Sequence, residues 1–505
     1  MRNIFKSGLS ALAIITAMAL PAKADLTAPQ VRDALFSYYE AFGYQVATSS
    51  EDYVNGTLVV REMTLNVPIP DDDVIISVTV EEFTLIENND GSVDFRVPDL
   101  LPMYIDIAED GEVGAEIVME MASTEMKGRA SGDLDNIRIE TSADATSIRV
   151  KSLMVEGENL PLTVVMATGP LDSDYTIRKL DDDVRDISGD YEIEAVDITA
   201  NVAEPDGDGF FSMTASIGDM AMEFASILKV TDDPKDMLAA GFDIDATMEF
   251  GPTSIDMNFR DGDDRFAGSS SAASSTFGFK LSKDEMGYTI ATKEADVLVS
   301  GSEIPLPQIK FSYDELVFDF NVPLSQGDGP RDFYSKTALR DFEMAEALWS
   351  IFDPSQQLPR DPVTVALDVS GKVIVLLDLL APENIDKLDD LDGPPMLPVS
   401  VNLNELLISA AGAMATGNGR VEFDFTNPNT IAGFPAPQGS FTFNVKGAFG
   451  LMDKLVTMGL LPEDASMGFR AMLGAFSKPI GEDHLESVIE LGADGSIKAN
   501  GQRIQ

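Results

Sequence analysis

The sequence predicts a mainly β protein, with long antiparallel strands in one curved sheet, or in two sheet-rich halves, and a few amphipathic helices packed on them. Three observations predict this class. Apolar and polar residues alternate along many segments, Asn-Gly and Asp-Gly pairs lie between such segments, and only a few stretches show helical periodicity.

The alternation is clearest in three segments. In residues 74–80, Val74, Ile76, Val78 and Val80 occupy one face, and small polar residues lie between them. Residues 421–425 and 441–446 repeat the pattern with Val and Phe on one side and Glu, Asp, Asn, Thr or Lys on the other. Strands of this kind have one wet and one dry face, which is typical of antiparallel sheets.

Five dipeptides predict tight hairpin turns, because both central residues of a type I′ turn need a positive φ. They are Asn55-Gly56, Asp90-Gly91, Asp110-Gly111, Asp494-Gly495 and Asn500-Gly501.

Four segments predict helices, and a fifth does so weakly. The first begins near Thr27, which forms a capping box with Gln30, and it ends at Gly43. The later ones are 332–352, 449–459 and 462–477, with the weaker one inside 218–240. We expect the two C-terminal helices to pack on the strands near 421–425 and 441–445 and to close one end of a groove. If they do, Phe476→Ala should cost about 3–5 kcal/mol.

The first 24 residues have the pattern of a cleavable export signal. Arg2 and Lys6 precede an apolar run over residues 9–20, and Ala22-Lys23-Ala24 supplies small residues before a cleavage site. The run is about twelve residues long, well short of the ~20 needed to span a bilayer. We therefore expect cleavage after Ala24, a chain that does not span a membrane, and a periplasmic location.

The Pro-rich acidic stretch 382–398 is the strongest candidate boundary in the rest of the chain. It separates a β-rich region with an N-terminal helix, 25–390, from a β region with a helical hairpin, 391–505. A single continuous domain with a surface loop at this stretch is the alternative.

The chain is strongly acidic, with 86 Asp and Glu against 35 Lys and Arg and a net charge of −51. Residues 1–24 hold three basic residues and no acidic one, so their removal changes the charge to −54. Such a field repels nucleic acid and anionic surfaces. It is also typical of solubility in a salty medium, or of cation or basic-partner binding.

The residue types exclude several chemistries. With no Cys and one His, His484, the chain lacks thiol catalysis, Cys-based zinc sites and multi-His metal sites. We identify no catalytic residue and no cofactor-binding residue. Metal binding stays open, because acidic runs occur at 71–73, 181–183 and 206–209, but none has the spacing of a calcium loop. Two groups of methionines could line an adaptable groove or fill a core: Met119, Met121 and Met126, and Met452, Met458, Met467 and Met472.

Several motifs resemble an uncharacterised family of exported alphaproteobacterial proteins, a domain of unknown function that covers most of the mature chain. They lie at 347–354 (Ala-Leu-Trp-Ser-Ile-Phe-Asp-Pro), 358–362, 455–463, 470–476, 494–497 and 500–503. They are packing and turn motifs, so the resemblance implies no catalytic residue. More distantly, the pattern is similar to periplasmic proteins whose long curved sheets shield lipid.

The sequence therefore predicts a non-enzymatic periplasmic binding or structural protein of the cell envelope, with an apolar groove for lipid or an envelope-protein partner. The alternative is a carboxylate-based periplasmic hydrolase, assisted by calcium. A continuous apolar trough inside the sheet favours the first function. Two inward carboxylates about 5–10 Å apart favour the second.

Overall fold

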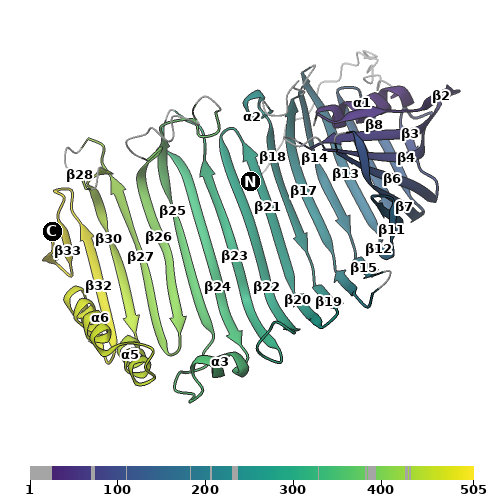
Figure 1. Ribbon diagram of the computed structural model, residues 1–505. Coiled ribbons are helices and arrows are strands. Elements are labelled where there is room, and N and C mark those ends of the chain that lie inside the picture. The colour runs from purple at the N-terminus through teal and green to yellow at the C-terminus, as the bar shows by residue number, and fades with distance from the viewer. Residues whose placement is uncertain are drawn as a thin grey trace, which may run out of the picture.

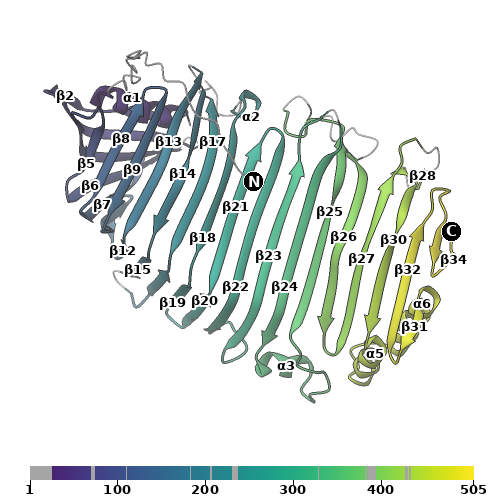
Figure 2. The same ribbon diagram turned by 180° about the vertical axis from the view of Figure 1, so that it is seen from behind.

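The computed structural model describes residues 26–505 except 42, 70–73, 110, 182–183, 205–206, 230–236, 328, 382–383, 385–393, 427–429 and 432–433. Within these residues, one antiparallel sheet of 32 strands extends from one end of the molecule to the other (Figure 1). The sheet curves, and Figure 2 shows its outer face from behind. The predicted mainly β fold with a long, curved antiparallel sheet is confirmed.

The N-terminal half of the sheet has an upper and a lower wall, named from their positions in Figure 1. The upper wall consists of β5 (Val93–Arg96), β8 (Lys127–Asp133), β9 (Asn136–Ala143), β13 (Leu171–Asp181), β14 (Val184–Ile193), β17 (Met220–Lys229), β18 (Asp243–Phe250) and β21 (Ser274–Ser282). The lower wall consists of β6 (Leu100–Glu109), β7 (Glu112–Thr124), β10 (Ala145–Val155), β12 (Leu162–Thr168), β15 (Val196–Ala203), β16 (Phe210–Ile217), β19 (Thr253–Asp261) and β20 (Asp264–Ala272).

Ten further strands join the two walls and continue the sheet to the C-terminus. They are β3 (Thr57–Pro68) and β4 (Val74–Glu87) at one end, and β22 (Glu285–Gly301), β23 (Ile309–Pro323), β24 (Arg331–Met344), β25 (Val363–Val375), β26 (Met396–Ala410), β27 (Ala413–Phe423), β30 (Pro437–Lys446) and β32 (His484–Leu491). Short strands complete the edges and turns: β1 (Gln45–Ala47), β2 (Ser50–Val54), β11 (Glu158–Leu160), β31 (Lys478–Gly481), β33 (Ile497–Ala499) and β34 (Gln502–Arg503), with β28 (Thr430–Ile431) and β29 (Phe434–Pro435) as a separate pair.

A line of bulges and kinks, which we call the crease, crosses the sheet between the walls. On β3 the pairing with β4 skips Glu62, and on β22 the pairing with β23 skips Glu294. Between β3 and β22, the chain passes from one wall to the other through short breaks of one to three residues, which lie in line with these two positions. An example is Glu194-Ala195, between β14 of the upper wall and β15 of the lower wall. The line continues to Asp341 on β24. A bulge bends its strand, so a bulge on successive strands folds the whole sheet along one line.

Helix α1 (Ala28–Ala41) covers the inner face of the N-terminal strands. Val31 is fully buried. It belongs to a cluster of buried residues that includes Leu58 of β3, Leu85 of β4, and Ile137 and Leu228 of the upper wall. The predicted capping box is present, since the Thr27 amide donates to Gln30 Oε1 at 2.9 Å. Glu87 Oε1 of β4 also accepts from the Ala28 amide at 2.8 Å. This end therefore contains the largest buried core of the described residues.

The other helices lie along the rims, and two helix predictions need correction. The pair α5 (Ala448–Thr457) and α6 (Glu463–Phe476) confirms the C-terminal helices. Segment 332–352 is mostly strand β24, and only α3 (Glu346–Phe352) is helical. In 218–240, β17 and the short α2 (Met237–Ala240) flank residues outside the described part. Cross-strand pairing makes 331–344 and 220–229 strands, so only part of each prediction is wrong. Trp349 and Phe352 of the predicted apolar stripe do lie in α3, and α2 lies within 218–240.

The glycine of each described turn pair has a positive φ, but only Asn55-Gly56 and Asn500-Gly501 have positive φ at both positions. Glu156-Gly157 and Ala411-Gly412 do so as well, although neither contains the Asn or Asp that predicts such turns. The candidate boundary at 382–398 lies largely outside the described residues, and β25 and β26 on either side pair with each other.

Candidate functional site: an apolar trough

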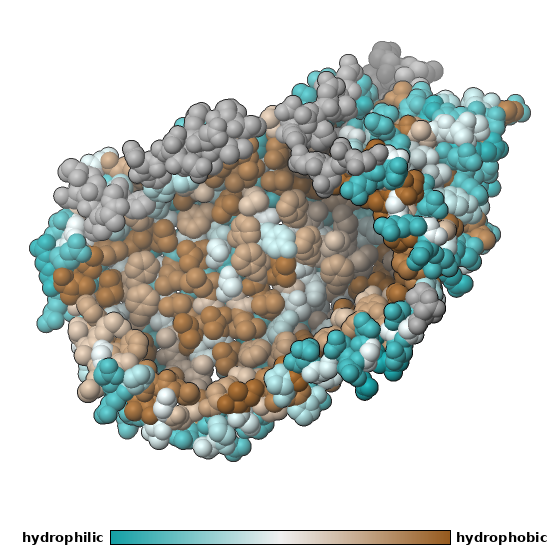
Figure 3. All heavy atoms as spheres, in the orientation of Figure 1, coloured by the Kyte–Doolittle hydropathy of each residue, from teal (hydrophilic) through white to brown (hydrophobic). Residues whose placement is uncertain are grey.

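The hollow face of the sheet is mostly apolar. Figure 3 shows it as a connected apolar surface with a few polar residues inside it and hydrophilic residues along much of the described border. We call this surface the trough. The register places apolar residues of successive strands side by side. One such row, which only Ser335 interrupts, is Phe224, Ala246, Phe279, Tyr288, Phe320, Ser335, Val369 and Leu403. From β9 to β32 the upper part of this surface spans about 60 Å at ~4.8 Å per strand.

The centre of the trough exposes large side chains. Five residues of the central strands β23, β25 and β26 have 36 to 47% of their surface accessible, namely Leu316, Phe318, Val365, Leu367 and Ile408. Phe318 also belongs to an aromatic cluster on this face, with ring centroids 5.5 Å from Phe320 and 6.4 Å from Tyr288. Fully burying one such side chain stabilises by about 1.5–3 kcal/mol. Covering the exposed part of each would therefore gain about 1 kcal/mol.

Glycines opposite aromatic residues let their rings lie on the sheet. Phe443 pairs with Gly417 and Phe441 pairs with Gly419, and the two rings stack with centroids 6.3 Å apart. A Cβ at 417 would lie 2.7 Å from the Phe443 ring, and one at 419 would lie 2.5 Å from the Phe441 ring. The close approach needs glycine, and it keeps the trough surface shallow at this end.

Acidic side chains of these strands lie on the opposite face. On the strands from β9 to β32, no described residue that faces the trough above the crease is Asp or Glu. On the outer face, Arg340 forms ion pairs with Glu315 at 3.1 Å and with Glu405 at 2.7 Å. The hydrogen bonds that Arg340 donates to Glu405 are the main cause that lowers the pKa of Glu405. Inward carboxylates of the kind that the hydrolase alternative requires are therefore absent from this part of the trough.

The crease adds further acids to the outer face. Exposed acidic residues stand in or beside the crease on strand after strand, namely Glu62, Glu81, Asp99, Glu125, Asp144, Glu194, Asp219, Glu294, Asp314 and Asp341. Four of them, Glu62, Glu125, Glu294 and Asp341, have a positive φ near 50°. These acidic residues of the crease were not predicted from the sequence. The pattern that indicates them is a pair of consecutive polar residues that interrupts an alternating strand, such as Lys293-Glu294 and Asp314-Glu315.

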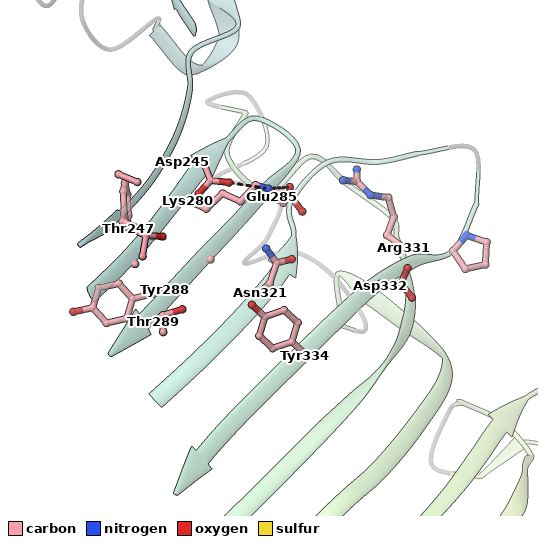
Figure 4. Close-up of a pocket in the computed structure, with 15 residues that line it drawn as sticks. Asp245, Thr247, Lys280, Glu285, Tyr288, Thr289, Asn321, Arg331, Asp332 and Tyr334 are labelled. Atoms are coloured by element: carbon pink, nitrogen blue, oxygen red, sulfur yellow. Dashed lines mark ion pairs between the residues drawn. The ribbon is translucent and has the colours of Figure 1, made fainter. Parts of the chain in front are cut away.

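A polar depression of 640 Å³ on the outer face is the main rival site (Figure 4). It lies over Gly278 and Gly287, where side chains are missing from the sheet surface. Lys280, which lines it, forms ion pairs with Glu285 at 2.9 Å and with Asp245 at 3.4 Å. These acids raise the pKa of Lys280, mainly through the hydrogen bond with Glu285. The second basic residue of its lining, Arg331, lies 3.9 Å from Asp284. Because both basic residues already have acidic partners, the depression offers a ligand little that water does not.

A second polar depression, of 1070 Å³, is lined by acidic and basic residues of β8, β9, β13 and β14. Two of its acidic residues, Glu140 and Asp174, form ion pairs with Arg138. Within the described residues, no group of three or more His, Asp or Glu side chains could hold a metal ion. Acidic residues 71–73 and 182–183, and Asp206, lie outside the described residues.

The Trp-containing motif at 347–362 forms a compact corner on the lower rim. The guanidinium of Arg360 lies 4.4 Å from the Trp349 ring and 2.6 Å from Asp353 Oδ2. Asp353 is 1% exposed and accepts from the amides of Leu358 and Gln357 at 2.8 and 2.9 Å. Burial alone would raise the pKa of Asp353, but these amides and Arg360 outweigh it and lower that pKa. The motif is thus a packing and turn motif.

The other singled-out residues fall in different places. Met119 lies beside Met103 and Val150, and Met121 lies beside Leu101 and Ile148, in two neighbouring apolar rows of the lower wall. Met126 of the same group lines the second polar depression instead. Met467 and Met472 on α6 are more than half exposed and do not fill a core. His484 begins β32 opposite Lys446.

Comparison with known proteins adds no relative: the chain matches no family model, no curated protein and no solved structure. In the described residues, no helix has the length and apolar character needed to cross a membrane. The trough is therefore the candidate site on its own geometry.

Proposed function

We propose that this chain is a non-enzymatic binding protein of the cell envelope, exported to the periplasm, whose trough holds the acyl chains of lipids or similar long amphiphiles. The observation that carries this proposal is the connected apolar inner face with half-exposed Phe, Leu, Val and Ile at its centre. Apolar patches this large on soluble proteins usually mark binding surfaces.

Acyl chains suit the trough better than an extended peptide does. Every central strand already has hydrogen-bonded neighbours on both sides, as β23 has in β22 and β24, so the trough floor offers a peptide few backbone partners. A peptide backbone buried there would lose its hydrogen bonds to water, at a cost of about 1–3 kcal/mol for each unpaired group. Hydrocarbon chains have no such groups.

The size of the trough agrees with this class of ligand. The trough extends about 60 Å perpendicular to its strands, which is several times the width of one lipid. Several acyl chains therefore fit side by side along this length. Covering the five most exposed central residues alone would contribute about 5 kcal/mol before the entropic cost of ordering the ligand.

The direct test is mass spectrometry of lipids that co-purify with the protein from its own envelope. We expect bound lipid with the natural chain and much less with Leu367→Glu, which places a carboxylate in the centre of the trough. Asn418→Glu adds the same charge to an exposed position on the outer face, where Asn418 pairs with Thr442, and should leave the lipid content unchanged. A natural chain that carries no lipid and does not bind a fluorescent fatty acid would refute the proposal.

A further inference from the structure

The lower rim at the C-terminal end of the trough carries an unpartnered apolar surface. Helix α6 presents Phe469, Met472 and Phe476 at helical spacing, and these residues are 49, 51 and 40% exposed. We call them the apolar stripe. The opposite side of α6 is the covered one, because it contains the buried Ser466 and the partly buried Arg470 and Leu473. The expected burial of the stripe against β27 and β30 is therefore wrong.

The helical hairpin is firmly attached although its stripe is free. Asp483 caps α5 by accepting from the amides of Phe449 and Gly450 at 3.0 and 2.9 Å. Arg470 of α6 donates to the Phe449 carbonyl at 2.9 Å and pairs with Asp453 at 2.6 Å. At the far end, the Phe476 carbonyl accepts from the side chains of Ser487 and Asn500. These bonds fix the side of α6 that faces outward.

Charge distinguishes the hairpin from the rest of the chain. Residues 448–476 contain three acidic residues (Asp453, Glu463, Asp464) and two basic ones (Lys454, Arg470), so their net charge is −1 in a chain of −51. A nearly neutral segment can approach a lipid surface without the repulsion that the acidic outer face would experience. Amphipathic helices with Phe, Leu or Met on one side bury that side at the headgroup boundary of a bilayer.

The rim position supports the same partner. Helix α3 lies on the same lower edge of the sheet as α5 and α6 (Figure 1), and its Ile351 is 64% exposed. Figures 1 and 2 place α5 and α6 on the hollow side of the sheet, at the end formed by β30 and β32. The apolar stripe therefore lies beside the C-terminal end of the trough, a surface that, on the proposed function, exchanges lipid.

We propose that the α5–α6 hairpin docks the C-terminal end of the trough on a lipid bilayer by inserting the apolar stripe into it. The inference rests on the proposed function, because a trough that holds lipid must meet the membrane that supplies it. The high negative charge outside the hairpin restricts the partner to a zwitterionic surface at low ionic strength, since anionic lipid repels the remainder of the molecule.

Flotation with vesicles tests this proposal. We expect the chain from Asp25 to float with phosphatidylcholine vesicles, and to float more weakly with vesicles that contain phosphatidylglycerol until salt screens the repulsion. Phe469→Glu with Met472→Glu should lower the bound fraction at least tenfold, because two half-exposed side chains lose their apolar contact with the bilayer. Leu134→Glu with Leu180→Glu is the matched control. Both leucines are 51% exposed on the upper rim, so this pair should stay within twofold of the natural chain.

The same variants separate this inference from the proposed function. Leu367→Glu should float like the natural chain while carrying less lipid, and the stripe variant should lose flotation. If the stripe variant floats like the natural chain, the docking proposal fails even where the trough binds lipid. A concentration-dependent dimer that the stripe variant abolishes, with no flotation of the natural chain, would identify a second copy as the occupant and overturn the proposal.

Discussion

Replacing Gly419 by alanine should destabilise the sheet near the C-terminal end of the trough. A Cβ at this position would lie 2.4 Å from the Ser440 carbonyl oxygen and 2.5 Å from Cδ1 of Phe441. Ordinary contacts begin about 1 Å farther out, so β27 and β30 must separate or the ring must rise into the trough. Overpacking of this kind costs about 1–3 kcal/mol.

The matched control is Gly468→Ala in α6, where an added Cβ meets nothing within 4 Å. This change should stabilise by about 0.5–1 kcal/mol, because alanine loses less backbone entropy than glycine in a helix. Urea titration followed by circular dichroism compares the two variants. If Gly419→Ala unfolds within about 0.5 kcal/mol of the natural chain, the close ring-to-backbone contact is not a constraint and the account of the glycines is wrong.

Two further predictions concern the rims. Phe476→Ala should lower the free energy of unfolding by about 1–2 kcal/mol rather than 3–5, because the ring is already 40% exposed. Urea titration measures this loss, and a value above about 3 kcal/mol would mean that the stripe is packed in solution. Asp353→Asn should lower the thermal midpoint at pH 7. A carboxylate with a lowered folded-state pKa stabilises above its unfolded pKa, and that contribution is lost as the pH falls through its folded value. The difference in thermal midpoint between Asp353→Asn and the natural chain should therefore shrink below about pH 4. A difference that stays constant from pH 7 to pH 3 would contradict the role of the Asp353 charge.

The alternating segments could be predicted well because side-chain alternation is a local property. Residues 74–80 lie in β4 and residues 441–446 lie in β30, as expected, whereas Phe425 falls just beyond the end of β27. Apolar residues of β24 mimic helical spacing, and only the pairing of Leu316 with Leu339 and its neighbours on β23 shows that they belong to a strand. Such pairing is non-local and is not visible in one segment.

The site could be predicted in kind but not in place. An apolar groove was expected, yet its position depends on the crease, which appears only when bulges on many strands are aligned. The C-terminal helices were found correctly, but their amphipathic pattern was interpreted as a buried face. A sequence pattern identifies an apolar side without saying whether this chain or a membrane covers it.

The single layer of the sheet has a consequence for how the molecule unfolds. The most extensive contacts of the described elements are between hydrogen-bonded neighbours, such as β22 with β23 and β25 with β26, and the largest buried core lies at the N-terminal end. Stability is then approximately a chain of nearest-neighbour terms, as in repeat proteins. The C-terminal hairpins should open one after another while the end that α1 covers stays folded. A molecule built in this way can vary in length by whole hairpins, and each added hairpin would lengthen the trough without disturbing the core.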